Sequence, residues 1–326
     1  MRSQCLFTGL LLVSVLTACS STDSGTPTDR GSTAASGGHS PSVVSPPATT
    51  SPVAPRRPAG TTAVLVGAGD IASCDSTGDS RTTALLERTP GIVFTLGDNA
   101  YPTGSRTDFT RCYQPTWGQV RARTRPAVGN HEYGTGNADA YFDYFGAAAG
   151  PRGKGYYSYD AGTWHVVVLN TNCGSVPGGC GRGSAQERWL RTDLAASNAT
   201  CTVAMGHHPL FTSARTHPPA TETRPLVQAL YDAGAELLLA GHNHVYERFA
   251  PQTPAGRRDE TRGIREIVAG TGGAALYPFG RTAANSELRN NHTFGVVRLT
   301  LSPASYRWDF LSTSGRFTDT GRGTCH

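Results

Sequence analysis

Short apolar runs recur along residues 61–326 and alternate with stretches of helical spacing. An apolar run of this length that ends in Gly, Asp or Pro is typical of a buried strand. The predicted strands are TAVLVGAGDI, GIVFTLGDN, RPAVGN, WHVVVLNTN with YYSYD as its hairpin partner, CTVAMGHHP, ELLLAGHNH, REIVAG, FGVVRLTL and YRWDFL. Helices are predicted over residues 79–89, 184–197 and 224–235, and Ser184 with Glu187 has the spacing of a capping box. This alternation predicts an α/β sandwich with mixed sheets.

Residues 1–60 follow a different pattern. Arg2, followed by the apolar stretch from Leu6 to Leu16, is typical of an export signal. This apolar stretch is too short for a membrane-spanning helix. LTAC at residues 16–19 resembles a bacterial lipobox, so residues 1–19 are expected to be a lipoprotein signal peptide with Cys19 as the lipidated mature N-terminus. An ordinary secretory signal is the alternative. Residues 20–60 are rich in Ser, Thr, Pro and Gly, which predicts a disordered linker. The folded domain is expected over residues 61–326, outside the cytoplasm, either lipid-anchored or secreted.

The cysteines are suited to such a compartment. The chain has eight, and loss of Cys5 with the signal and lipidation of Cys19 leave six. An even number of cysteines in an oxidising compartment predicts disulfides, but many pairings are open. The expected pairs are Cys173–Cys180, which encloses the flexible loop GSVPGG, then Cys74–Cys112 and Cys201–Cys325. Metal binding by these cysteines is disfavoured because none lies in a C-x-x-C pair.

Side chains that can bind metals follow five of the predicted strands, each close after a glycine. They are Asp70 in VGAGD, Asp98 and Tyr101 in LGDNAY, Asn130 and His131 in VGNHE, His207 and His208 in MGHHP, and His242 and His244 in AGHNH. Taken one at a time, an Asp in a turn, a packing Tyr or a core His would be ordinary. Because sites in α/β proteins form beyond the carboxyl ends of strands, the whole set predicts one polar site at one edge.

The ordered series GD, GDNAY, GNHE, GHHP and GHNHVYER resembles the motifs of the purple acid phosphatases, a branch of the calcineurin-like metallophosphoesterases. The resemblance runs from Ala63 to Arg248 and implies a four-layer α/β/β/α sandwich with two mixed β-sheets. It also implies a centre of two metal ions. The implied metal ligands are Asp70, Tyr101 and His244 on one ion, Asn130, His207 and His242 on the other, and Asp98 bridging both. Phenolate and carboxylate donors suit Fe(III), whereas amide and imidazole donors suit Fe(II), Zn or Mn.

The activity implied by this resemblance is hydrolysis of phosphate esters by a metal-bound hydroxide, as in an acid phosphatase acting on phosphomonoesters, with phosphodiesters as a further substrate class. His131 matches the family's outer-sphere histidine that steadies the phosphate or helps the leaving group. His217 lies ten residues after His207, as a second substrate histidine does in plant-type members, although simple loop exposure is the alternative. His208 either faces the site or, as the neighbour of a ligand more often does, turns away and packs.

The expected partner is a small phosphate ester, and the expected link to the membrane is the lipid anchor alone. A net charge of +5 spread over scattered arginines gives no basic stripe for nucleic acid. Plant members carry an N-terminal β-sandwich that contacts substrate, and a linker stands there in this chain, so the natural substrate is open. Two other hypotheses are a non-catalytic metal- or phosphate-binding surface lipoprotein and a nucleotide-cofactor protein built on GAGDIA, which no helix directly follows.

Overall fold

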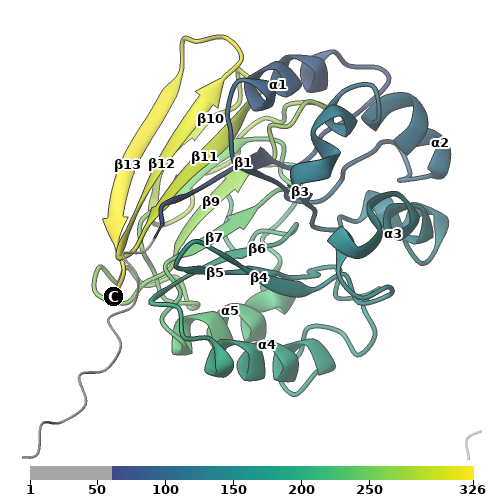
Figure 1. The fold of residues 1–326 in the computed structure, drawn as a ribbon. Coiled ribbons are helices and arrows are strands. Elements are labelled where there is room, and N and C mark those ends of the chain that lie inside the picture. The colour runs from purple at the N-terminus through teal and green to yellow at the C-terminus, as the bar shows by residue number, and fades with distance from the viewer. Residues whose placement is uncertain (1–60) are drawn as a thin grey trace, which may run out of the picture. The chain divides into compact units, whose positions relative to one another are not determined.

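This computed structural model describes residues 61–326, which form two β-sheets with helices packed against them (Figure 1). The hypotheses for the signal peptide, Cys19 and the linker lie outside these residues. The strands are β1 Ala63–Ala68, β2 Ile92–Thr95, β3 Thr124–Arg125, β4 Tyr157–Ala161, β5 Trp164–Val168, β6 Cys201–Met205, β7 Leu237–Ala240, β8 Tyr246–Phe249, β9 Arg265–Ala269, β10 Ser286–Asn290, β11 Gly295–Ser302, β12 Ser305–Ser312 and β13 Thr318–Thr324. The α-helices are α1 Gly78–Glu87, α2 Arg106–Asp108, α3 Asp139–Phe145, α4 Ala185–Ala196 and α5 Arg224–Asp232. Short helical turns of other types are η1 Phe109–Tyr113, η2 Trp117–Arg123, η3 His131–Thr135, η4 Gly146–Ala149 and η5 Thr221–Thr223.

Both sheets mix parallel and antiparallel strands. The strand order is β13-β12-β11-β1-β2-β3 in the first sheet and β10-β8-β9-β7-β6-β5-β4 in the second. β1, β2 and β3 are parallel neighbours, and so are β5, β6, β7 and β9. Parallel neighbours end at the same edge of a sheet, so the loops after these strands can share one site.

Successive residues of the central strands face different layers, because strand side chains alternate. Leu65 of β1 and Leu237 of β7 belong to one buried cluster between the two sheets. Their neighbours face outward: Val66 packs in a cluster with residues of α1 and α3, and Leu238 in a cluster with residues of α4 and α5 (Figure 1). The predicted four-layer α/β/β/α sandwich with two mixed sheets is confirmed.

The apolar pattern does not predict β8, β10 or β13, and it predicts a longer strand at β3 than the structure has. β10 has the polar sequence SELRN and is held by antiparallel pairing with β8. β13 contains Gly321 and Gly323, which lie opposite Trp308 and Tyr306 of β12 and leave room for those rings. The strand predicted for residues 125–130 shortens to β3 because Pro126 has no N–H for a ladder hydrogen bond. Pairing and packing with partners distant in sequence therefore decide these segments.

Three disulfides are present within residues 61–326: Cys74–Cys112, Cys173–Cys180 and Cys201–Cys325. Cys201 begins β6 and Cys325 follows β13, so their bond joins the two sheets. Glu236 lies near this bond, but bonded cysteines have no thiolate to offer a metal. None of the helices described is long and apolar enough to cross a membrane.

Candidate metal centre

The loops after β1, β2, β3, β6 and β7 carry the predicted ligands, and several of these residues adopt unusual backbone conformations. Asp70, Asp98 and His242 have positive φ values of 61°, 49° and 65°. A positive φ is costly for a residue with a side chain, and such residues gather at functional sites. The surrounding fold therefore holds three of the predicted ligands in turns that their own preferences would avoid.

One group of donor atoms forms around the hydroxyl of Tyr101. The Tyr101 hydroxyl oxygen lies 3.1 Å from Asp70 Oδ1 and 3.0 Å from His244 Nε2. His244 Nε2 is itself 3.2 Å from Asp70 Oδ1. Asp70 and His244 are buried. The carboxylate, the phenol and the imidazole therefore meet at one point, as the resemblance implies for the first ion.

A second group of donor atoms forms around His207. His207 Nε2 lies 3.0 Å from Asn130 Oδ1 and 3.2 Å from His242 Nδ1. Asp98 Oδ2 stands between the two groups, 3.3 Å from His207 Nε2 and 3.1 Å from the Tyr101 hydroxyl. The side chains of the seven predicted ligands thus form two groups of donor atoms, with Asp98 Oδ2 between them.

The arrangement of lone pairs around His207 fits a bound cation. His207 Nδ1 lies 2.7 Å from the carbonyl oxygen of Leu96 and donates its proton there, so the lone pair belongs to Nε2. This lone pair faces oxygen atoms of Asp98 and Asn130, which are acceptors as well. Metal–ligand bonds of about 2.0–2.2 Å place neighbouring donors about 3 Å apart, which matches these distances. Only a proton or a metal ion satisfies so many acceptors at once.

Charges within the donor groups shift the pKa values of their members. Burial opposes a charge on Asp98, but His207 outweighs burial and lowers the pKa of this carboxyl well below its usual range. Burial also opposes a charge on His207, yet the Asp98 carboxylate raises the pKa of the imidazole to about 9. Burial and the carboxylates of Asp70 and Asp98 raise the pKa of Tyr101 well above its usual value. A metal ion must therefore displace a proton from the Asp98–His207 pair, and a phenolate at Tyr101 requires a strongly polarising ion.

Glu132 of the GNHE segment holds two ligand loops together, a role that the sequence does not single out. Its side chain is fully buried. Oε1 accepts hydrogen bonds from the backbone N–H groups of Asn99 (2.7 Å) and Ala100 (3.3 Å), and Oε2 from those of Asp98 (3.1 Å) and Gly129 (2.7 Å). Burial and the nearby Asp98 carboxylate raise the pKa of Glu132 to about 7. The loop of Asp98 and the loop of Asn130 are therefore tied through one carboxyl group.

Four aromatic rings surround the ligands. The ring centroid of His131 lies 4.3 Å from that of Tyr101, and that of His217 lies 4.2 Å from that of His242, so both predicted outer histidines reach the centre. The ring centroid of His208 lies 4.3 Å from that of His242, so of the two alternatives for His208 the structure favours the one in which it faces the site. The reason is a hydrogen bond of its Nδ1 with the Thr171 hydroxyl, a contact between two loops. The sequence also gives no signal for Tyr277, whose ring stacks on His244 at 3.9 Å.

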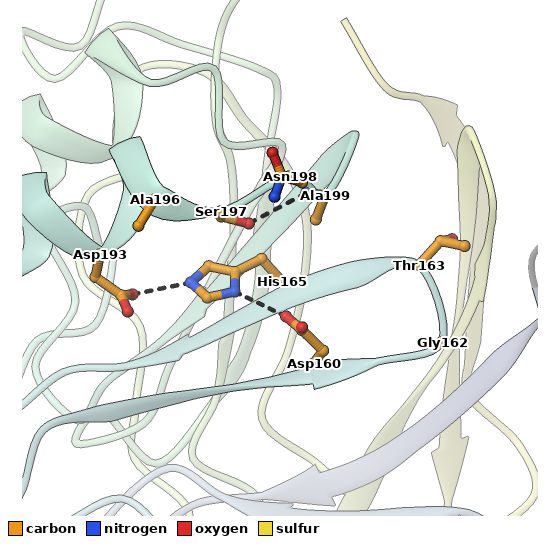
Figure 2. Close-up of a pocket in the computed structure, with 9 residues that line it drawn as sticks. All are labelled: Asp160, Gly162, Thr163, His165, Asp193, Ala196, Ser197, Asn198 and Ala199. Atoms are coloured by element: carbon orange, nitrogen blue, oxygen red, sulfur yellow. Dashed lines mark hydrogen bonds and ion pairs between the residues drawn. The ribbon is translucent and has the colours of Figure 1, made fainter. Parts of the chain in front are cut away.

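A polar cavity of about 310 Å³ lies at the opposite end of the second sheet, around the start of β5 and the end of α4 (Figure 2). His165 stands between two carboxylates there, with Nδ1 3.0 Å from Asp160 Oδ1 and Nε2 2.8 Å from Asp193 Oδ2. Because both ring nitrogens of His165 face carboxylates, neither is placed to activate a serine as a nucleophile, and Ser158 also donates its hydroxyl proton to Asp193. Its contacts connect the β4–β5 hairpin with α4.

Residues 66–246 match the family described as calcineurin-like phosphoesterase. The chain belongs to the calcineurin-like phosphoesterase family. Among solved structures, the purple acid phosphatase PPD1 from yellow lupin (Lupinus luteus) seeds superposes with a TM-score of 0.67 at 20% identity, covering 81% of this chain and 54% of the lupin chain. This superposition shows the same fold, and the family match spans all the loops that carry the two donor groups.

Purple acid phosphatases are also among the related sequences. Purple acid phosphatase 15 of Arabidopsis thaliana is 26% identical over 55% of this chain and 40% of its own length. "Probable inactive purple acid phosphatase 9" of the same organism is 25% identical over 63% of this chain and 37% of its own length. The chain therefore matches less than half the length of these relatives, and membership of the family leaves turnover to be tested.

Proposed function

We propose that this chain hydrolyses phosphate esters, as an acid-phosphatase-type phosphomonoesterase, with two metal ions held by the seven donors. The observation that supports this most directly is the position of Asp98 Oδ2, which lies within 3.3 Å of His207 Nε2 and 3.1 Å of the Tyr101 hydroxyl. One carboxylate oxygen between two donor groups is the arrangement of a bridging ligand. A single-ion site would not need a second group of donors on the other side.

The proposed ions follow from the chemistry of each donor group. Asp70, Tyr101 and His244 include a carboxylate and a phenol, which suit Fe(III), and Asp98 adds a second carboxylate. The amide of Asn130 and the imidazoles of the second group suit Fe(II), Zn or Mn. When bound, a pair of such ions would activate water as a nucleophile and neutralise charge on the phosphate.

The outer residues would hold the substrate. His131 is positioned by its backbone N–H, which donates to Asp98 Oδ1 at 2.8 Å, and its side chain is 35% exposed at the rim. We assign His131 to contact with the phosphate or the leaving-group oxygen, and His217 to a second contact on the His242 side. The proposed substrates are small phosphate esters. An extracytoplasmic location is part of the proposal, supported by the three disulfides.

Metal analysis of the purified protein, combined with a panel of phosphomonoesters, phosphodiesters and nucleotides, tests this function. We expect two metal ions per chain and hydrolysis that stops when a chelator removes them. Asp98→Asn should lose both metal content and turnover, whereas Asp160→Asn, at the distant cavity, should keep both. Two bound ions with no hydrolysis of any ester would instead favour a metal- or phosphate-binding protein without catalysis.

A further inference from the structure

His208 lies beside the proposed centre without belonging to either donor group. Its ring centroid is 4.3 Å from that of His242 and 4.8 Å from that of His207. The residue is partly exposed. Within residues 61–326, Nδ1 of His208 has a hydrogen-bond partner and Nε2 has none. Nε2 is also accessible, because it is absent from the set of fully buried polar atoms that lack a partner. His208 therefore has a ring nitrogen that is free to meet a ligand.

Thr171 decides which nitrogen of His208 carries the proton. The Thr171 hydroxyl oxygen accepts backbone hydrogen bonds from His207 N at 3.1 Å and from His208 N at 2.8 Å. These two bonds use both lone pairs of a hydroxyl oxygen. Its one proton must then go to His208 Nδ1, which lies 3.0 Å away. A neutral His208 that accepts at Nδ1 carries its own proton on Nε2.

We propose that His208 is a substrate-contacting residue that donates its Nε2–H to a phosphate oxygen on the His242 side of the centre. The inference rests on the proposed function, because an ester phosphate is the anion expected there. A donor fixed in place by Thr171 loses little freedom on binding, so it strengthens phosphate binding efficiently. It would add a third contact with the substrate to those assigned to His131 and His217.

Metal ligation is the competing role for His208. His207, His208 and His242 can each bring one donor atom within 4.8 Å of the others. A ligand needs a free lone pair, however, and the only lone pair of His208 is used by the Thr171 hydroxyl. The same hydrogen bond that prepares a donor for phosphate therefore disfavours a metal ligand.

Two variants of the metal-loaded protein test the contact. His208→Phe keeps a ring against His242 but has no donor, whereas His208→Gln keeps an N–H at a similar reach. We expect calorimetry with inorganic phosphate to show binding weaker by about tenfold to a hundredfold in His208→Phe, and within about threefold of wild type in His208→Gln. KM for an aryl phosphate should rise in parallel, and metal content should stay at the wild-type value in both. Loss of a metal ion in His208→Phe, or unchanged phosphate affinity, would overturn the proposal.

The protonation state can be tested without any turnover. Nitrogen-15 NMR of histidine-labelled protein should show His208 as the Nε2–H tautomer, and Thr171→Ser should preserve it because the hydroxyl remains. A proton on Nδ1 would contradict the inference. If no ester is hydrolysed but phosphate affinity still depends on His208, the proposed function fails and the contact stands. If esters are hydrolysed and His208→Phe has wild-type phosphate affinity and KM, the contact fails and the function stands.

Discussion

Replacing Glu132 by glutamine tests whether one buried carboxyl group holds the metal centre together. Each carboxylate oxygen accepts two backbone hydrogen bonds. Oε1 accepts from Asn99 and Ala100 in the loop that carries Asp98, and Oε2 accepts from Asp98 itself and from Gly129, beside Asn130. An amide keeps one acceptor oxygen, so in either orientation its NH₂ group faces two N–H donors. Two hydrogen bonds are lost and two buried donors are left without a partner.

The size of the effect follows from that count. Each buried donor left unpaired costs about 1–3 kcal/mol, so the free energy of unfolding should fall by about 2–6 kcal/mol. The two ligand loops should also separate, because Glu132 joins them. Since Asp98 stands in both donor groups, we expect metal content to drop at both positions.

Glu236→Gln is the matched control. Glu236 is also a buried carboxyl group that accepts a backbone hydrogen bond, from Thr202 N at 2.6 Å, but it precedes β7, at the other end of the strand from His242. Its other carboxylate oxygen has no hydrogen-bond partner, so an amide can keep the bond from Thr202 N, and we expect this variant to lose little stability and to keep its metals. Denaturant unfolding and metal analysis after reconstitution measure both effects. A Glu132→Gln protein with wild-type metal content and unchanged stability would show that the carboxyl group does not hold the loops.

Four further predictions concern separate features. His242→Ala should lose mainly the divalent ion and regain partial turnover with excess divalent metal, whereas His244→Ala should lose iron and stay inactive; full activity of either without added metal would contradict the ligand assignment. The iron-loaded protein should be coloured and lose its visible band with Tyr101→Phe, and a colourless iron-loaded wild type would refute a ferric phenolate. Burial raises the pKa of Glu266 to about 8, so between pH 4.5 and about 8 the folded state holds a proton that the unfolded state has lost. Stability should therefore fall as pH rises through this range, and Glu266→Gln should flatten the pH dependence of Tm. Cys19→Ala should move the protein from the membrane fraction to the soluble fraction, and unchanged partitioning would rule out the lipid anchor.

Sequence and structure agree on features that depend only on residues close together in the chain. An apolar run followed by Gly and a polar residue is complete within a few positions, so the turns at Asp70, Asp98 and His242 can be recognised without knowing what packs against them. The same holds for the alternation that predicts the sandwich. The division of the ligands between two ions came from resemblance to a known family, and the donor distances are compatible with it.

The sequence by itself determined which residues follow the strands and therefore which side chains could form a site. Tertiary structure alone decided how loops distant in sequence meet there. Glu132 becomes important because the loops after β2 and β3 come within reach of one carboxyl group. His208 faces the centre because Thr171, from the loop after β5, bonds its ring. Tyr277 covers His244 from a loop whose sequence has no recognisable pattern. Such contacts depend on the register and packing of whole layers, and no local pattern of residues encodes them.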